Sequence, residues 1–296
     1  MPRVDVVIVS YNSRDTLRQC VEPLLAMPDV AVTVVDNASP DGSLEVIGDL
    51  PVRTIQSGRN AGFGTGCNLG MAAGSAELVL FLNPDAVIAE EDLARLTAVL
   101  DAEPAVGLVG PRLLDGDGGL IPSLRRYPRP GSTWARAMYL HRLMPDAAWA
   151  NQIITRPSAY DEVAYPEWIS GAAMLVRREA AEAIGGFDEG FFLYCEDVDI
   201  CARLRAAGHE IRYEPGATVH HVGGHSAPRS SLLPVLAASR LRYARKHGSR
   251  LAALLQRLGM AIEALTHVPA GLRRPGYARG HAMALWTVVR GQQRPA

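Results

Sequence analysis

Cysteine is scarce in this sequence and long apolar runs are absent, and both shortages narrow the class of protein. The four cysteines form no C-x-x-C pair and match no zinc spacing. We therefore expect reduced thiols in the core of a cytoplasmic protein, without disulfides or a structural zinc. No segment approaches the roughly 20 uncharged apolar residues that span a membrane. Only Arg3 precedes the first predicted strand as a basic residue, so we expect no signal peptide and a protein that is soluble or peripheral.

Several catalytic and nucleotide-binding motifs are also missing. The sequence contains no H-E-x-x-H, no G-x-S-x-G and no internal repeat, which argues against zinc proteases and serine hydrolases. Its glycine-rich loop, Gly62-x-Gly64-x-Gly66, follows the third predicted strand and lacks both the G-x-G-x-x-G spacing and a G-K-[ST] ending. This loop is therefore neither a dinucleotide fingerprint nor a Walker loop.

Acidic residues almost disappear after residue 228. Residues 229–296 contain 11 arginines and one lysine against a single acid, Glu263, a net charge of +11 that leaves −12 for residues 1–228. A basic tail on an acidic body indicates contact between the tail and an anionic partner such as a lipid surface, a polyphosphate or nucleic acid. Because the body is acidic, we expect no nucleic-acid partner.

Strands and helices alternate through the first half of the chain. Apolar runs predict buried strands at residues 4–9, 30–35, 52–55 and 78–82. Helices are predicted between them, at 15–27 with Ser13 as N-cap, in a short stretch ending near 50, and at 65–73. The alternation predicts an α/β fold with a Rossmann-like, mostly parallel, doubly wound sheet.

Polar side chains follow each of these strands: Asn12, Asp36, Asn60 and Asp85. Ligands of open α/β sheets bind outside the carboxyl ends of the strands, so these positions predict a nucleotide site. Asp36 is placed to accept hydrogen bonds from a base or ribose, and Asp85 suits a hard cation shared with a diphosphate. The alternative is that each residue only caps a loop, and that Asn-Pro-Asp at 83–85 is a turn. Taken together, the four positions favour nucleotide binding.

The middle of the chain predicts a helix at 89–103, a strand at 106–109 and then a long irregular segment at 111–167. A segment of that length without regular structure is usually a functional loop or lid. It carries a basic patch, which is equally consistent with a phosphate contact and with a solvated turn: Arg125, Arg126, Tyr127 and Arg129.

Acidic residues gather after a predicted strand at 167–176 and helix at 177–184. Glu196, Asp197 and Asp199 begin a predicted helix that runs to about 207. Acids at a helix N-terminus interact favourably with the helix dipole, which is a purely structural explanation. The aromatic run before them would exclude water, and this favours a functional site.

Two histidines lie on the second of two short predicted strands, at 210–213 and 218–222. His220 and His221 point to opposite faces of that strand, so at most one of them faces the cleft. The one that does is a candidate metal ligand. His225 lies just beyond the strand.

The tail predicts helices at about 230–246, 250–265 and 277–289. Helical spacing places an apolar stripe on the middle helix, for which packing on the main domain is the favoured role and a membrane surface the second: Leu251, Leu254, Leu255, Leu258 and Ile262. The arginines that support the membrane alternative are Arg240, Arg242, Arg245, Arg250, Arg257, Arg273 and Arg274.

An ordered series of short motifs extends over residues 4–226. It comprises Val-Ser-Tyr-Asn (9–12), Val-Asp-Asn-Ala-Ser (35–39), Arg-Asn-x-Gly-x-Gly (59–64), Asn-Pro-Asp (83–85), Trp-x-Ser-Gly (168–171), Gly-Gly-Phe-Asp-Glu (185–189), Tyr-x-Glu-Asp-Val-Asp (194–199) and His-His (220–221). The series resembles the family 2 inverting glycosyltransferases of GT-A fold. Within that family it is similar to bacterial rhamnosyltransferases that act on GlcNAc-diphosphate-polyprenol.

The resemblance implies a GT-A domain at 1–228 and a basic helical C-terminal region at 229–296. Residues 1–110 would form the nucleotide-sugar-binding half and 111–228 the acceptor and catalytic half. Asp197 matches the catalytic base, with Glu196 beside it. Asp85 matches the last acid of a D-x-D metal motif whose first acid is here Asn83, and His221 matches the histidine that completes the metal site. The other implied residues are Ser10, Tyr11, Asn12, Asp36, Arg59, Asn60, Gly62, Asn83 and Asp85 for the nucleotide sugar, and Trp168, Ser170, Gly171 and Glu196 for the acceptor.

The implied reaction is a metal-assisted single displacement with Mn²⁺ or Mg²⁺. It would transfer L-rhamnose from dTDP-β-L-rhamnose to a hydroxyl of a glycan or of a polyprenyl-diphosphate-linked acceptor in cell-wall or polysaccharide synthesis. Alternatives are a UDP-sugar donor (galactofuranose, GlcNAc or glucose) and a non-catalytic nucleotide-binding module. We expect a cytoplasmic protein with peripheral contact to the inner face of the membrane, and a homo-oligomer is compatible with the sequence.

Overall fold

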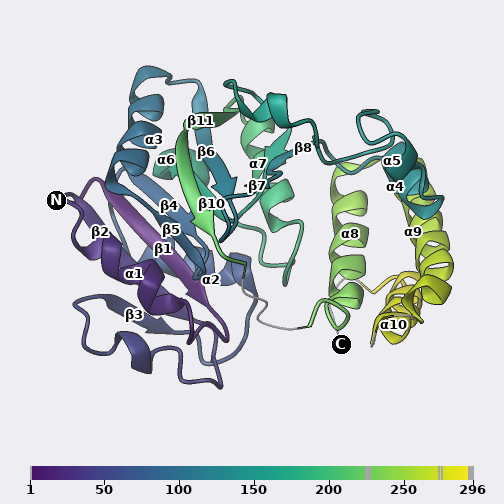
Figure 1. The fold of residues 1–296 in the computed structure, drawn as a ribbon, viewed down its shortest axis with the longest axis horizontal. Helices are drawn as coiled ribbons and strands as arrows, with labels where there is room; N and C mark the ends of the chain where they lie inside the picture. The colour runs from purple at the N-terminus through teal and green to yellow at the C-terminus, as the bar shows by residue number, and fades with distance from the viewer. Residues whose placement is uncertain (1, 224–227, 273, 275, 293–296) are drawn as a thin grey trace. The chain divides into compact units, whose positions relative to one another are not determined.

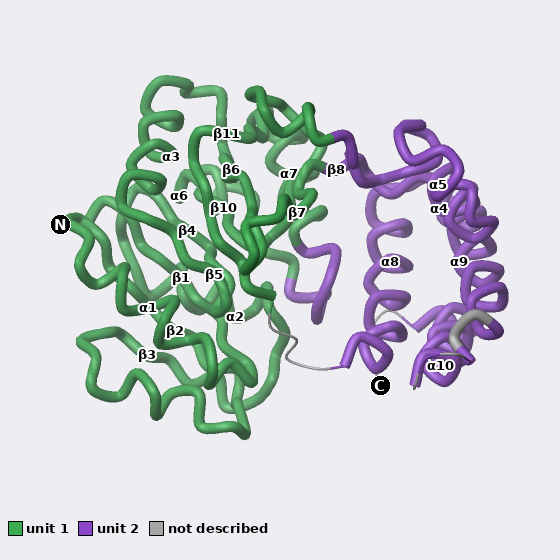
Figure 2. The backbone as a smooth tube through the Cα atoms, in the orientation of Figure 1, with its two compact units in different colours: residues 1–124, 157–188, 197–226 green, residues 125–156, 189–196, 227–296 purple. Residues whose placement is uncertain are grey.

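The computed structural model describes residues 2–223, 228–272, 274 and 276–292. His225 and Arg273, both named above, lie outside these residues. The chain forms two compact units (Figure 2). Unit 1 comprises residues 1–124, 157–188 and 197–226, and unit 2 comprises 125–156, 189–196 and 227–296. The basic patch at 125–129 and Glu196 therefore belong to unit 2, together with the C-terminal helices.

Unit 1 is built on a nine-stranded sheet in the order β3-β2-β1-β4-β10-β6-β11-β5, with β7 beside β6 (Figure 1). The first four strands of this order are parallel, β10 is antiparallel to both neighbours, β11 is parallel to β6, and β5 is antiparallel to β11. The strand bounds are β1 (Val4–Ser10), β2 (Val30–Asp36), β3 (Arg53–Gln56), β4 (Leu78–Leu82), β5 (Ala86–Ile88), β6 (Val106–Leu114), β7 (Leu120–Ile121), β10 (Ala173–Arg177) and β11 (Glu210–His221). The sheet is therefore mixed, and the four predicted N-terminal strands form one parallel block within it.

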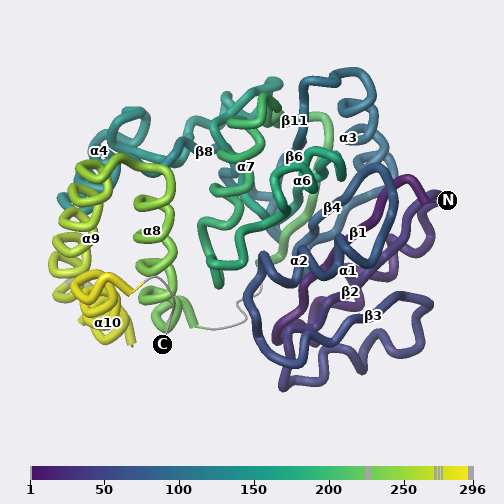
Figure 3. Tube along the Cα trace, turned by 180° about the vertical axis from the view of Figure 1, so that it is seen from behind, coloured from purple at the N-terminus to yellow at the C-terminus, as the bar shows by residue number. Residues whose placement is uncertain are grey.

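Helices cover both faces of this sheet, as the doubly wound prediction requires (Figure 3). Side chains alternate along β1: Val6 and Ile8 enter one core with the leucines of α1 and α3. On the other face, α2 lies against Val7 and Val9. A Cβ at Gly70 would lie 2.3 Å from Val7 Cγ1, so glycine lets helix and strand approach closely. The helix bounds are α1 (Leu17–Leu25), α2 (Phe63–Ala72), α3 (Glu90–Ala102), α6 (Arg178–Ala183) and α7 (Glu196–Ala206).

Three local predictions were wrong. Ser13 does not cap α1, whose N-cap is Thr16; the backbone amide of Ser13 instead donates to Ser43 Oγ. The two strands predicted at 210–213 and 218–222 are one strand, β11, with an irregularity between Glu214 and Thr218. The segment 111–167 is not irregular throughout: it contains the end of β6, β7, β8 (Leu124–Arg125), α4 (Pro130–Ala137), α5 (Leu140–Leu143) and a 3₁₀ turn at Pro157–Tyr160.

Unit 2 is helical and contains α4, α5, α8 (Leu233–His247), α9 (Arg250–Gly271) and α10 (Tyr277–Arg290). Its small core joins α8, α9 and α10 through Leu241, Met260 and Val288. The carboxylate of Glu263 is buried and forms ion pairs with Arg136 and Arg240, at 2.5 and 2.7 Å. None of the described helices combines the length and the apolar character that crossing a lipid bilayer would need.

The ion pairs of Glu263 predict a pH-dependent contribution to stability. Burial alone would raise the pKa of this carboxyl, but the charges of Arg240 and Arg136 and their hydrogen bonds lower it from 4.5 to about 2. The stabilisation is complete above pH 4.5 and is lost as the pH falls towards 2. We compare the free energy of unfolding of the wild type with that of Glu263→Gln. The gap between the two proteins should be about 3 kcal/mol larger at pH 6 than at pH 2. Urea titrations at both pH values measure this difference, and an equal gap at the two pH values would contradict it.

Candidate active site

The carboxyl ends of β2, β1 and β4 lie at one edge of the sheet of unit 1. β1 pairs in parallel with β2, so that Ser10 lies opposite Asp36, and in parallel with β4, so that Ile8 lies opposite Leu82. The amide of Asn37 continues the ladder by donating to the Ser10 carbonyl at 2.8 Å. Residues that follow these strands therefore share the edge at which the sequence predicted a ligand.

Buried polar atoms mark the ends of β1 and β2. Ser10, Asp36 and Asn37 are all buried. Asp36 Oδ2 accepts from the Ser39 amide at 3.1 Å, and Asn37 Nδ2 donates to the Gly62 carbonyl at 3.0 Å. Ser10 Oγ, Asp36 Oδ1 and Asn37 Oδ1 find no hydrogen-bond partner among the described residues. An unsatisfied buried polar group costs roughly 1–3 kcal/mol, so such a cluster is suited to a polar ligand. Sequence reasoning did not single out Asn37, although it follows Asp36 directly in the same motif.

The glycine loop lies beside these atoms. The Gly62 amide donates to Asn60 Oδ1 at 3.2 Å, and Gly62 has φ +96°, which favours glycine. Asn60 is half-buried and Arg59 is exposed. Gly66 serves packing, since its Cβ would lie 2.7 Å from Val9 Cγ1. The first part of the loop can therefore contact a ligand, while Gly66 allows α2 to pack closely against β1.

Backbone strain concentrates near the same edge and before α7. Six non-glycine residues of the described chain have positive φ, and four of them stand at these places. Asn12 and Ala38 follow β1 and β2, with φ +54° and +58°, and Tyr194 and Cys195 precede α7, with φ +70° and +66°. Such conformations cost of order 1–3 kcal/mol each and cluster at functional sites.

Asp85 and His221 meet at the end of β4. His221 Nε2 lies 3.0 Å from Asp85 Oδ1 and 3.3 Å from Asn83 Nδ2. The contact arises because the end of β11 pairs with β5, so that His221 lies opposite Ala86. His220 is exposed. Of the two histidines, the structure brings His221 to the carboxylate.

The Asp85–His221 pair fits a divalent cation. A buried carboxylate oxygen and an imidazole nitrogen converge on one point, and both are ligand types that first-row divalent metals accept. Within the part of the chain that the structure describes, no group of three or more His, Cys, Asp or Glu could hold a metal ion. A metal held here would therefore take further ligands from a bound molecule, for which a diphosphate is suited.

Cys20 lies beneath this pair without taking part in it. Its thiol lies 3.4 Å from the Asn83 carbonyl, and burial, followed by the charge of Asp85, raises the pKa of the thiol well above its usual value. It stays protonated and does not compete as a ligand. All four cysteines are buried, which confirms the prediction that they lie in the core: Cys20, Cys67, Cys195 and Cys201.

Asp197 lies one strand further along the same edge. β10 runs antiparallel to β4, so the residues before it arrive at the carboxyl end of β4, where the Asn83 amide donates to the Ala172 carbonyl at 2.9 Å. The Gly171 amide donates to Asp197 Oδ2 at 3.2 Å, and the Val198 amide donates to Oδ1 at 2.8 Å. A Cβ on Gly171 would lie 3.3 Å from Asp197 Cβ, so glycine permits this approach. The carboxylate is half-buried and oriented by backbone amides.

The other acids of this motif differ from Asp197. Asp199 is fully buried and paired with Arg203 at 2.7 Å, which is a structural role. Glu196, the first residue of α7, is also buried. Trp168, in β9 (Trp168–Ile169), and Ser170 are half-buried, and the Ser170 amide donates to the Ser123 carbonyl.

Following the order of the strands, this edge offers buried polar atoms, then the Asp85–His221 pair, then an oriented carboxylate. The predicted residues that unit 1 brings together there are Ser10, Asp36, Asn83, Asp85, Gly171, Asp197 and His221.

Comparisons with known proteins identify the family of the chain. The family model "Glycosyl transferase family 2" matches residues 5–160. The "N-acetylglucosaminyl-diphospho-decaprenol L-rhamnosyltransferase" of Mycobacterium tuberculosis is 32% identical over 253 residues, covering 76% of this chain and 77% of that protein. "Rhamnosyltransferase WbbL" of Escherichia coli is 26% identical over 231 residues, covering 75% and 84%.

Solved structures share the fold. The mannosyltransferase PcManGT of Pyrobaculum calidifontis, in complex with GDP-Man and Mn²⁺, superposes with a TM-score of 0.57 at 17% identity, over 98% of this chain and 87% of that chain. TarS 1-349 of S. aureus, in complex with UDP-GlcNAc, gives a TM-score of 0.54 at 15% identity, over 99% and 93%. The chain is therefore a glycosyltransferase with the GT-A fold, and it belongs to glycosyl transferase family 2.

Proposed function

We propose that the protein is an inverting rhamnosyltransferase. It transfers L-rhamnose from dTDP-β-L-rhamnose to a hydroxyl of GlcNAc-diphosphate-polyprenol or a related glycan acceptor, in cell-wall or polysaccharide synthesis. The observation that carries the proposal is the position of the Asp85–His221 pair, with the buried polar atoms of β1 and β2 on one side and Asp197 on the other. The names of the two rhamnosyltransferase relatives support this choice of sugar.

The ends of β1 and β2 would hold the nucleotide. Asp36 Oδ1 and Ser10 Oγ are buried oxygens suited to the polar edge of a base and the hydroxyl of a sugar ring. Tyr11 and Asn12 follow Ser10 directly. The loop of Arg59, Asn60 and Gly62 would close the same side, with the exposed guanidinium available to the diphosphate.

Asp85 and His221 would hold Mn²⁺ or Mg²⁺, with Asn83 beside them. When bound, the ion would neutralise charge that develops on the leaving nucleoside diphosphate. The protein's own contribution is to fix one carboxylate oxygen and one imidazole nitrogen before the donor arrives.

Asp197 would act as the general base. Its two oxygens are held by the amides of Gly171 and Val198, so the carboxylate is oriented without being neutralised by those contacts. It would accept the proton of the acceptor hydroxyl as that oxygen attacks the anomeric carbon and the diphosphate leaves from the opposite face. A β-linked donor then gives an α-rhamnoside. Trp168, Ser170, Gly171 and Glu196 are proposed to contact the acceptor.

We place the reaction in the cytoplasm, at the inner face of the membrane, because the proposed acceptor is a lipid. The basic helices α8–α10 would provide peripheral contact with anionic lipid.

Replacing Asp197 with asparagine tests the base. The amide keeps the size of the side chain but does not accept a proton, so transfer should fall by at least about 100-fold. The thermal shift produced by dTDP-rhamnose should remain. As a control, Asp161→Asn removes an exposed carboxylate paired with Arg112 and should leave turnover unchanged. Near-normal turnover of Asp197→Asn would remove Asp197 from the base role.

The two neighbouring histidines provide a matched test of the metal site. Donor binding raises the melting temperature by mass action, so dTDP-rhamnose should shift the wild type, with a larger shift when Mn²⁺ is present. His221→Asn should abolish the Mn²⁺-dependent part of this shift, and His220→Asn should keep it, because only His221 lies beside Asp85. Equal behaviour of the two variants would exclude His221 as a ligand.

The same assay with UDP-galactofuranose, UDP-GlcNAc and UDP-glucose identifies the donor. A shift and turnover with one of these alone would keep the chemistry and replace the sugar. Binding of a donor without transfer or hydrolysis would instead favour a non-catalytic nucleotide-binding module.

A further inference from the structure

Helix α9 has two faces, and its leucines occupy the exposed one. The buried face consists of Gln256, Gly259, Met260, Glu263 and Ala264. The opposite face bears the predicted apolar stripe, of which Ile262 is half-buried. The five leucines of this face are exposed: Leu251 at 66%, Leu254 at 51%, Leu255 at 37%, Leu258 at 48% and, two turns beyond Leu258, Leu265 at 55%. We call these five residues the leucine stripe. An exposed apolar stripe of this length indicates an interaction surface.

No exposed carboxylate side chain accompanies the leucine stripe on α8, α9 or α10. The single acid of residues 229–296 is Glu263, and it is buried between two arginines. The surface of these helices is therefore apolar and cationic. That combination repels a second copy of itself and complements an anionic partner.

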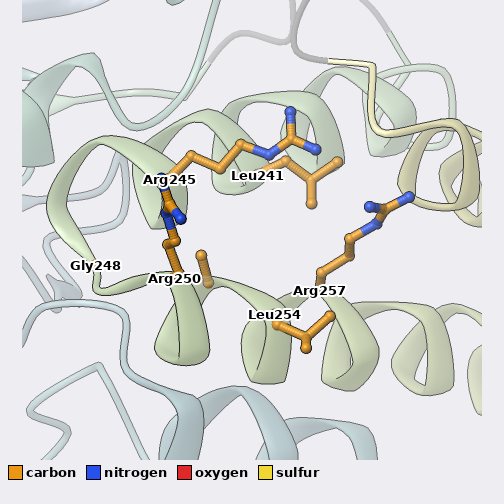
Figure 4. Close-up of a pocket in the computed structure, with 7 residues that line it drawn as sticks. Leu241, Arg245, Gly248, Arg250, Leu254 and Arg257 are labelled. Carbon is orange, nitrogen blue, oxygen red and sulfur yellow. The ribbon is translucent and has the colours of Figure 1, made fainter.

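A pocket of about 250 Å³ opens between α8 and α9, beside Leu254 of the stripe. Figure 4 shows Arg245 on α8, and Arg250 and Arg257 on α9, around it. Arg245 and Arg257 also donate to backbone carbonyls at the C-terminal end of α10 and at the residue that follows it. Arg257 Nη2 donates to Val289 at 2.7 Å, and Arg245 Nη1 donates to Gly291, the C-cap, at 3.3 Å. These bonds fix two guanidinium groups at the pocket, and Arg250 is exposed at the first position of α9.

We propose that this arginine pocket binds the phosphate of an anionic lipid headgroup while the leucine stripe enters the bilayer surface. Guanidinium groups bind phosphate through paired, charge-assisted hydrogen bonds. A helix with an apolar face and basic flanks lies in the plane of the interface. Trp286 on α10 is exposed with the Arg290 guanidinium 3.9 Å from its ring centroid, and tryptophan is favoured at the membrane interface. The inference deepens the membrane contact of the proposed function but does not depend on the donor sugar.

Vesicle flotation of the full chain tests the proposal. The wild type should float with vesicles that contain phosphatidylglycerol and not with pure phosphatidylcholine. Arg250→Gln should weaken partitioning about fivefold, as expected for one basic residue near an anionic surface, and Leu254→Ser with Leu258→Ser should abolish flotation. The matched controls are Arg95→Gln and Leu69→Ser, exposed positions in unit 1 that should not change flotation.

If something other than an anionic lipid occupies the arginine pocket or covers the leucine stripe, these experiments give different results. Each of the following results would overturn the proposal. Flotation without dependence on phosphatidylglycerol shows that no anionic headgroup is required. A thermal shift with inorganic phosphate but no flotation identifies a free-anion pocket. If the double leucine variant has a lower melting temperature but unchanged flotation, the leucine stripe is covered by protein. If the wild type forms a concentration-dependent dimer that this variant does not form, the stripe binds a second copy of the chain. Transfer to a short water-soluble acceptor analogue should be equal in all α9 variants, so failure here is distinguishable from failure of the proposed glycosyl transfer.

Discussion

The site depends on one constraint: β1 lies between β2 and β4 in parallel register. This pairing sets Ser10 against Asp36 and brings Asn83 and Asp85 to the same edge. It holds because β1 is apolar on both faces and both faces are covered: α1 and α3 pack on one side, and the glycines of α2 allow a close approach on the other. At the opposite end of β1, Asp5 is paired with Arg178 at 2.6 Å, and this ties β1 to the start of α6.

The antiparallel strand β10 completes the site. Had β10 been parallel to β4, residues 170–172 would lie at the far end of the sheet. Because β10 is antiparallel to β4, the Ala172 carbonyl accepts from the Asn83 amide and the Gly171 amide donates to Asp197. The motif at 168–171, from the second half of the chain, therefore reaches the edge that the first half forms. His221 arrives through a second antiparallel pairing, between β11 and β5. The mixed character of the sheet is thus what brings the proposed donor-side and acceptor-side residues together.

Much of this could be predicted where one physical signal dominates. β1, β2 and β4 were predicted because buried parallel strands are continuous apolar runs, and their polar ends follow from the chain direction. Strand alternation limited the candidate metal ligand to one of two histidines. Choosing His221 from the residues alone required the β11–β5 pairing, and β5 was not predicted. Leucine spacing is the strongest hydrophobic signal in α9, yet the leucines do not form the face of this helix that is buried within unit 2. Its buried face instead uses Gln256, Met260 and Glu263, the last stabilised by ion pairs that no periodicity reveals.

The central claim is that the edge of β2, β1 and β4 binds the nucleotide and its metal. A crystal structure with dTDP and Mn²⁺, with anomalous data at the manganese edge, tests it most directly. The account predicts a manganese peak within coordination distance of Asp85 and His221 Nε2, with the nucleoside against Asp36 and Ser10. A nucleotide bound elsewhere, or a manganese ion that contacts neither Asp85 nor His221, would contradict it.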